Sequence, residues 1–283
     1  MRVLDIEVTE ALVASWAGWF APVVQPFLVD EALAARVGEQ TTDVEMADEV
    51  RDTFGLYGPP DGTRYVWLSE VQFGALPRPN RSALVRGQRT LGRELVPSVR
   101  SWGSVVGDAA RRQADGHRFV WWPSLLQGRE EEVLREYVED GRRPSRHDGV
   151  SEQVWAASAG LLPDARRLAG LFPEGSGPNC FGTVMAAAGV VGADRVWMLR
   201  EPFEDWLAEA TWPGGDDGEL GTVLVWRSPD GLVQHAAVTL GAGWALHKPS
   251  QGWMSPYKVL AVDECKASSR SPGRRLERRH LLF

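Results

Sequence analysis

The sequence predicts an α+β fold in which a short helix that begins at a cysteine is followed by strands, two of which form a hairpin. Three features of the 283-residue chain predict it. The loop 174–179, rich in glycine and proline, leads into Cys180 and the apolar run 181–188, which is typical of a helix. Two strand-like runs follow at 221–226 and 234–247. Helical periodicity dominates the N-terminal half.

The N-terminal half is expected to be helix-rich, with two strands. In the run 9–37, apolar residues fall on one helical stripe that is interrupted near Pro22 and Pro26. The other predicted elements of this half are a helix that begins at Thr41, helices over 82–91, 105–114 and 129–139, and strands over 64–68 and 117–123.

A polar stretch with proline and glycine, 142–149, predicts a junction between domains. Residues 1–145 are therefore expected to form an N-terminal α+β region of unassigned function, which borders the Cys180 cleft and selects the substrate. Residues 146–266 are expected to form the domain that carries Cys180. The polar, arginine-rich end, 267–283, is expected to be a mobile basic tail.

Two histidines in the second strand-like run test the register of a hairpin. Side chains alternate along a strand, so His235 and Ala237 share one face. A two-residue turn would place His247 on the other face. A three-residue loop, 241–243, places it opposite Ala237, and the glycines favour this loop because one of its positions requires a positive φ. We expect both rings to face one cleft, with His247 orienting His235 and His235 acting on Cys180.

The position of Cys180 suits a nucleophile. A thiol at a helix N-terminus feels the positive end of the helix dipole and the unpaired N–H groups of the first turn, which favour a thiolate and can hold an oxyanion. We therefore expect a lowered pKa and reaction with iodoacetamide at mildly acidic pH. The alternative is a small core residue beside structural histidines. Cys265, next to Lys266 and beyond the last predicted strand, is expected to be a bystander or a surface residue.

The runs Asn-Cys-Phe-Gly at 179–182, Gly-Thr-Val-Leu-Val-Trp at 221–226 and His to His at 235–247 resemble the NlpC/P60 superfamily of cysteine peptidases and amidases. That family has a cysteine at a helix start, a Gly-Asp-Leu-Val-Phe-Phe-like strand and then a His-Val-Gly-Ile-Tyr-Leu-Gly…His strand pair. The resemblance covers roughly residues 170–262. It implies a papain-like core in which the helix that carries the cysteine packs on the sheet.

By this resemblance, Cys180 is the nucleophile, His235 the general base and His247 the third, polar member of the site. Two family positions differ, since the usual aspartates before the cysteine and in the Gly-Asp strand are Asn179 and Thr222. Asn179 is still a good N-cap and is expected to border the substrate. Among the thirteen tryptophans, those in loops rich in proline and glycine are candidate walls of the cleft: Trp212 and Trp253.

Three functions from different classes remain open. The first is an amidase- or peptidase-type hydrolase that forms an acyl-enzyme at Cys180 from an amide or thioester. The second is an acyl- or aminoacyltransferase of bacterial natural-product biosynthesis that uses the same acyl-enzyme. The third is an inert binding module. The expected partner is a small-molecule or peptide acyl substrate, free or linked to a carrier.

Composition excludes some other classes. The formal net charge of −7 argues against general nucleic-acid binding. No motif for a metal, a phosphate or a dinucleotide is present, so no cofactor is expected. No run has the length of a membrane span and no secretory signal is evident, so we expect a cytoplasmic protein. Lysine occurs only at 248, 258 and 266, and such preference for arginine is typical of G+C-rich bacteria.

The middle of the chain is basic, in contrast to its acidic start. We expect either a solvated face that balances acidic neighbours or a dock for an anionic substrate or carrier. The residues concerned are Arg78, Arg81, Arg86, Arg89, Arg93, Arg100, Arg111, Arg112 and Arg118.

Overall fold

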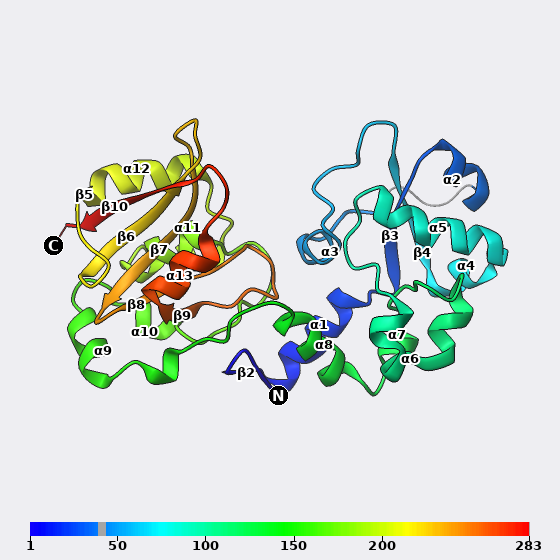
Figure 1. Cartoon of the computed structure of the whole chain (residues 1–283), viewed down its shortest axis with the longest axis horizontal. Helices are drawn as coiled ribbons and strands as arrows, with labels where there is room; N and C mark the ends of the chain where they lie inside the picture. The colour runs from blue at the N-terminus through cyan, green and yellow to red at the C-terminus, as the bar shows by residue number, and fades with distance from the viewer. Residues whose placement is uncertain (39–43, 283) are drawn as a thin grey trace. The chain divides into compact units, whose positions relative to one another are not determined.

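The computed structural model describes residues 1–38 and 44–282 (Figure 1). The chain forms two compact units. One contains Thr9–Tyr137, and the other contains Met1–Val8 together with the chain from Val138 onward. No helix of the described residues is long and apolar enough to cross a membrane. The helix that was predicted to begin at Thr41 has its start outside the described residues.

The division between the units differs from the predicted one in its N-terminal segment. Strands β1 (Arg2–Val3) and β2 (Ile6–Glu7) form a small antiparallel hairpin. The backbone N–H of Ser145 donates to the carbonyl of Leu4 over 2.8 Å, and Arg2 forms a 2.9 Å ion pair with Asp148. The first eight residues therefore belong with the unit that carries Cys180, although they lie farthest from it in sequence.

The Thr9–Tyr137 unit is helical around a two-stranded antiparallel sheet. Its elements are α1 (Glu10–Phe20), β3 (Val24–Val29), α2 (Glu31–Val37), α3 (Asp48–Phe54), β4 (Arg64–Ser69), α4 (Glu70–Ala75), α5 (Arg78–Thr90), α6 (Val99–Gln113), α7 (Pro123–Leu126) and α8 (Glu130–Glu139), the last of which runs into the other unit. Strand β3 pairs with β4, with Phe27 opposite Val66. Because Pro26 lies in this strand, the interruption predicted in the run 9–37 is a strand between two helices.

The strand predicted over 117–123 is wrong. These residues are irregular apart from one bridge, Ser98 to Arg118, and Pro123 begins α7. Trp121 and Trp122 are buried all the same. Their apolar character therefore reflects packing in the core and not pairing in a sheet.

The basic middle of the chain is partly internal. Arg93 is buried, and its guanidinium lies 4.2 Å from the ring centre of Phe54 and 4.7 Å from that of Phe27. It donates to Gln25 over 2.9 Å. Burial lowers the pKa of Arg93 to about 9. Arg93 therefore packs in the core of its unit and belongs neither to a solvated face nor to a surface dock.

The second unit is built on a six-stranded antiparallel sheet. Its strands are β5 (Thr211–Pro213), β6 (Leu220–Arg227), β7 (Val233–Gly241), β8 (Trp244–His247), β9 (Lys258–Ala261) and β10 (Arg275–Leu281). Their order is β5-β10-β6-β7-β8-β9. Its helices are α9 (Glu152–Ser158), α10 (Ala165–Leu168), α11 (Cys180–Ala187), α12 (Arg200–Ala210) and α13 (Val262–Ser269), with 3₁₀ turns η1 (His147–Gly149) and η2 (Ala193–Arg195). The predicted α+β fold, with the helix that begins at Cys180 packed on an antiparallel sheet, is confirmed.

The predicted mobile tail is wrong, because β10 lies inside the sheet between β5 and β6. Two of its arginines, Arg278 and Arg279, resemble residues of a solvated tail in the sequence but have partners in the folded chain. Arg278 forms a 2.8 Å ion pair with Asp217, and Arg279 donates to the carbonyl of Thr211 over 3.1 Å. Because these charged side chains have partners, the polar segment 275–281 can form a strand inside the sheet.

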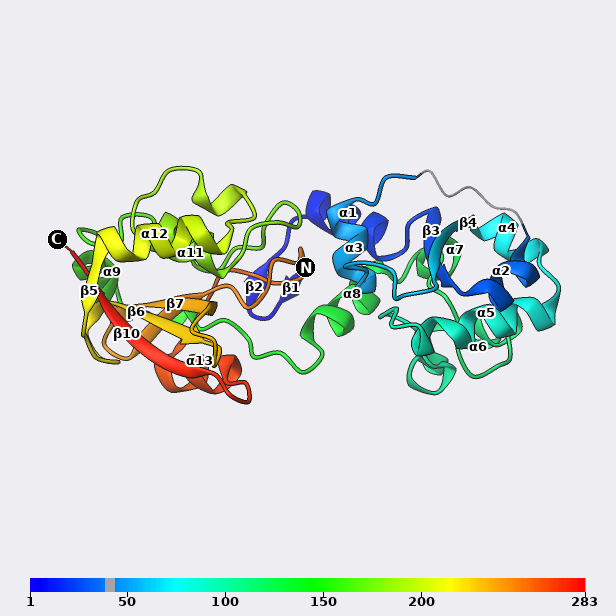
Figure 2. The ribbon, with the colours of Figure 1, turned by 90° about the horizontal axis from the view of Figure 1, so that it is seen from above.

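The sheet has two buried faces that carry different helices (Figure 2). The face under α11, called the α11 face, carries Val225, Ala236, Val238, Leu246 and Val259. The opposite face, called the α13 face, carries Leu224, Trp226, Ala237, Ala245 and Leu260, and packs against Cys265 of α13. The two sets alternate along each strand, as the pleat requires.

Candidate functional site

The turn that presents Cys180 is held on both sides. Asn179 caps α11: the N–H of Gly182 donates to its side-chain oxygen over 3.1 Å, and its amide nitrogen donates to the carbonyl of Met198 over 2.7 Å. The loop before it is tied down by a 3.0 Å bond from the N–H of Gly177 to the carbonyl of Gln251. Asn179 therefore fixes the helix start and the neighbouring segment together.

Gly182 allows α11 to lie close to η2. A β-carbon built on Gly182 would collide with the carbonyl oxygen of Ala193. The first turn of α11 thus packs against the backbone of η2.

The pKa of Cys180 shifts in the direction opposite to the expected one. The side chain is 8% exposed, and burial raises its pKa to about 11. The N–H groups of Ala236, Phe181 and Cys180 itself lower the pKa, as does the charge of Lys248, but they do not outweigh burial. The predicted thiolate at mildly acidic pH is therefore wrong for this state of the site. Desolvation of the charged form exceeds the effect of the helix N-terminus.

The hairpin has the predicted register. Val238 lies opposite Leu246, which places His247 opposite Ala237. The turn itself is shorter than the expected loop, since Ala242 and Gly243 connect the strands, with φ of 51° and 81°. A bulge before Gly241 restores the register that a three-residue loop would give.

Both imidazole rings share one face, as expected, and both are buried. Their ring centres lie 5.8 Å apart, with the rings edge to face. Burial, and then the charge of Arg274, lowers the pKa of His235 to about 4. Burial also lowers the pKa of His247, with smaller effects from His235 and Lys258. Both rings are thus neutral at pH 7, and within the described part of the chain neither nitrogen of His247 has a hydrogen-bond partner.

The face that carries the rings is not the one that carries Cys180. His235 lies against Trp226 of the α13 face, with ring centres 5.2 Å apart, while α11 packs on the opposite face. Among the described residues, no hydrogen bond joins the sulfur of Cys180 to either ring. The sulfur lies instead near the backbone N–H of Ala236, the residue after His235. The structure brings Cys180 to the backbone of β7 beside His235, and it leaves both rings on the other side.

Neither predicted tryptophan borders Cys180 as a cleft wall. Trp212 lies in the edge strand β5 and stacks on His280 at 4.8 Å. Two strands separate β5 from β7, so about 14 Å lie between them at ordinary strand spacing. Trp253 is fully buried and its backbone N–H donates to Ser176, so it supports the Cys180 loop from within. The surface position predicted for Cys265 is also wrong, since this side chain is buried in α13.

Sequence reasoning missed two features of the site. Lys248 follows His247, is fully buried and affects Cys180 electrostatically. A cavity of about 590 Å³ lies along the loop that leads to Cys180, and Ser176, Arg195 and Tyr257 are among its walls. The scarcity of lysine in an arginine-rich chain was a usable signal for Lys248. No local sequence pattern predicts the cavity, because its walls come from separate parts of the sequence.

Alkylation should distinguish the two cysteines. Iodoacetamide is expected to modify Cys180 before Cys265, because Cys180 retains some exposure while Cys265 has none. The rate should rise with pH up to about 11, since burial keeps the thiol protonated below that pH. Peptide mass mapping after timed alkylation between pH 7 and 10 measures both rates. Equal rates would contradict the role of exposure, and a rate at Cys180 that is already maximal at pH 7 would contradict its raised pKa.

The described residues contain no group of three or more histidine, cysteine or carboxylate side chains arranged to hold a metal ion. Comparison of the chain with models of known protein families, with curated proteins and with solved structures found no match.

Proposed function

We propose that Cys180 is the nucleophile of an acyl-transfer enzyme that acts on an amide or a thioester. One observation carries the proposal: the sulfur lies at the first residue of α11 and near three backbone N–H groups, those of Cys180, Phe181 and Ala236. Such a group of donors suits the negative charge that develops on sulfur and on a carbonyl oxygen during acyl transfer.

His235 is the proton carrier in this proposal. Its neutral ring takes the proton of the thiol, the sulfur attacks the carbonyl carbon, and the backbone N–H groups hold the oxyanion. The bond to the amine or thiol then breaks, and the leaving group takes the proton from the ring. Because the ring lies on the α13 face of an interior strand, this step requires the backbone of β7 at His235 to rearrange when the substrate binds. Catalytic hydrogen bonds often form only after the substrate binds.

The cavity beside the Cys180 loop supplies space for the acyl donor. It has a polar and charged wall, which includes Glu174 and Arg195, and an aromatic one at Tyr257. A small peptide or a substituted acyl group suits such a mixed surface.

A transferase is the second candidate, and the burial of Cys180 favours it. Cys180 is 8% exposed and is therefore largely shielded from water, so an acyl-enzyme formed there would persist until an amine acceptor enters. Hydrolysis and transfer share the acyl-enzyme and differ only in the second nucleophile.

Intact mass spectrometry tests the proposal. The protein is incubated with a panel of acyl amides and acyl thioesters, and a mass increase equal to the acyl group is expected for the parent protein. The matched control is Cys265→Ala, which should acquire the same adduct, whereas Cys180→Ala should acquire none. Decay of the adduct in buffer alone indicates a hydrolase. Decay only after an amine is added indicates a transferase. An adduct that persists in Cys180→Ala would overturn the assignment of the nucleophile.

A further inference from the structure

Two of the three lysines in this chain are buried beside the candidate site. Lys248 is 0% exposed and Lys258 is 4% exposed. Burial of an ammonium group costs free energy unless polar partners satisfy it. The arginine-rich composition elsewhere makes lysine at these two positions the more notable.

The two lysines belong to opposite faces of the sheet. Lys248 follows the end of β8, and its Nζ lies near the ring of Tyr257, which belongs to the buried cluster of the α11 face together with Cys180. Lys258 lies directly opposite His247 in the β8–β9 pair and therefore shares the α13 face with both histidines. Cys180 thus has a lysine on its own face of the sheet, and the histidines have the other.

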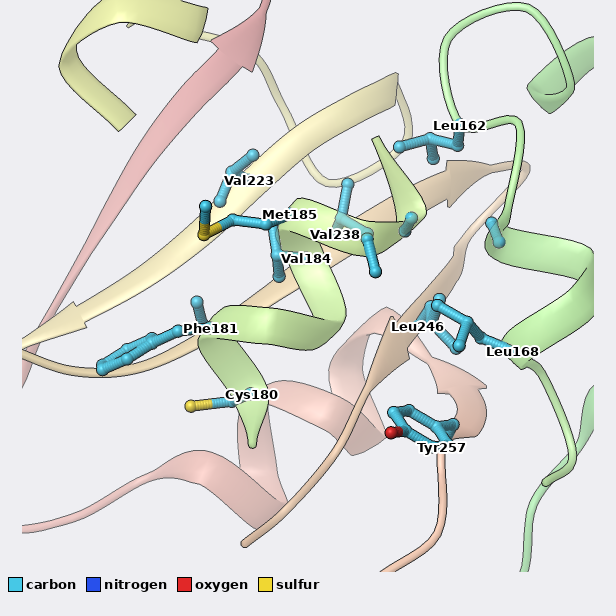
Figure 3. Close-up of a cluster of buried hydrophobic side chains, with 14 of the residues drawn as sticks. Leu162, Leu168, Cys180, Phe181, Val184, Met185, Val223, Val238, Leu246 and Tyr257 are labelled. Atoms are coloured by element: carbon cyan, nitrogen blue, oxygen red, sulfur yellow. The ribbon is translucent and has the colours of Figure 1, made fainter. Parts of the chain in front are cut away.

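The ammonium of Lys248 is held in place. Its Nζ donates to the carbonyl of Ser250 over 2.7 Å and to that of Gly252 over 3.1 Å. It also lies 5.8 Å from the ring centre of Tyr257, a member of the same buried cluster as Cys180 (Figure 3). Two carbonyls and an aromatic ring therefore orient the ammonium.

The charge of Lys248 acts on Cys180. It lowers the pKa of the thiol, in opposition to burial. Tyr257, the neighbouring titratable group on this face, has a pKa raised by burial, and its hydroxyl donates to the carbonyl of Asp194. Across the sheet, His235, His247 and Lys258 face the α13 side.

We propose that Lys248 is a positioning residue of the site, whose fixed, buried ammonium stabilises the thiolate of Cys180 and the oxyanion formed from its substrate. This inference rests on the proposed role of Cys180 and adds a charged group that neither histidine supplies. In a site shielded from water, one full charge acts more strongly on the sulfur than it would at the surface.

The test compares two chemically identical substitutions in the full-length chain. Lys248→Met removes the ammonium from the face of Cys180, and Lys258→Met removes one from the opposite face. The rate of alkylation of Cys180 by iodoacetamide is measured at a fixed pH between 7 and 7.5, where Lys258 is still mostly charged although burial lowers its pKa to about 8. Thermal unfolding checks the fold. Lys248→Met should slow the reaction about tenfold, as one pKa unit requires, and Lys258→Met should leave it within about twofold.

A third variant separates charge from loop structure. Ser255→Ala removes the 3.0 Å bond that the N–H of Ser250 donates to Ser255, and so loosens the same loop while keeping the ammonium. It should leave the alkylation rate near the parent value. Equal slowing by Lys248→Met and Ser255→Ala, or by Lys248→Met and Lys258→Met, would overturn the role of the charge.

The two proposals fail in different ways. A parent protein that acquires no acyl adduct refutes the acyl-transfer function, whatever the alkylation rates are. An adduct at Cys180 together with an unchanged alkylation rate in Lys248→Met refutes only the role of Lys248.

Discussion

The His235→Ala variant should lose roughly 10³-fold or more of the turnover that Cys180 supports, whereas His247→Asn should retain a measurable part of it. The sulfur is protonated at neutral pH because burial raises its pKa to about 11, so an acceptor must take its proton. The neutral ring of His235 belongs to the residue next to the N–H that meets the sulfur. Loss of this ring removes the proposed proton carrier. His247 contacts the ring edge to face with no hydrogen bond among the described residues, so an amide at position 247 leaves the carrier in place.

The measurement is the rate of acyl-enzyme formation, followed by intact mass with the donor that the panel identifies. His280→Ala is the matched control, because His280 is another buried histidine of the same sheet and lies in β10, separated from β7 by β6. It should leave the rate near that of the parent. Small and equal losses for all three variants would mean that His235 is a structural residue of the α13 face.

The register of the hairpin could be predicted from the sequence, because it depends on local rules. Strand alternation and the need for positive φ near Gly241 and Gly243 were enough to place His247 opposite Ala237. Alternation relates the side chains of one strand to each other. It does not say on which face of the sheet a distant helix packs, so the position of Cys180 relative to the rings could not be derived in this way.

The misplaced elements share another physical cause. Strand β10 looked like a solvated tail because its arginines are charged, but their partners, such as Asp217, lie some sixty residues away in sequence. Likewise, the pKa of Cys180 was expected to fall because the helix start is visible in the sequence, while the burial that raises it comes from the tertiary structure. Local pattern predicts local geometry, and it leaves desolvation and long-range pairing undetermined.

The stability of the sheet should fall as the pH drops from about 6.5 toward 4, and His235 should account for about 3 kcal/mol of the loss. Burial lowers the pKa of His235 to about 4 in the folded chain, against an ordinary value of 6.5 in the unfolded chain. Between these values the unfolded state binds more protons, so its formation becomes more favourable as the pH falls. The stabilisation is complete above pH 6.5 and is lost progressively through this window.

Urea unfolding followed by tryptophan fluorescence at pH 7.5 and pH 5 measures the effect, which should be about 2 kcal/mol for His235 between pH 6.5 and 5. His247, whose pKa burial also lowers, adds to it in the same direction. The carboxylates with lowered pKa values, Glu204 and Asp217 among them, lose their contribution only below their ordinary values of 4.5 and 3.8, and so act below pH 5. His235→Gln should flatten the dependence, and the exposed His117→Gln should not. If the pH dependence of stability is unchanged in His235→Gln, the acid-sensitive group lies elsewhere. That result would contradict a buried, neutral His235 ring as the proton acceptor of Cys180.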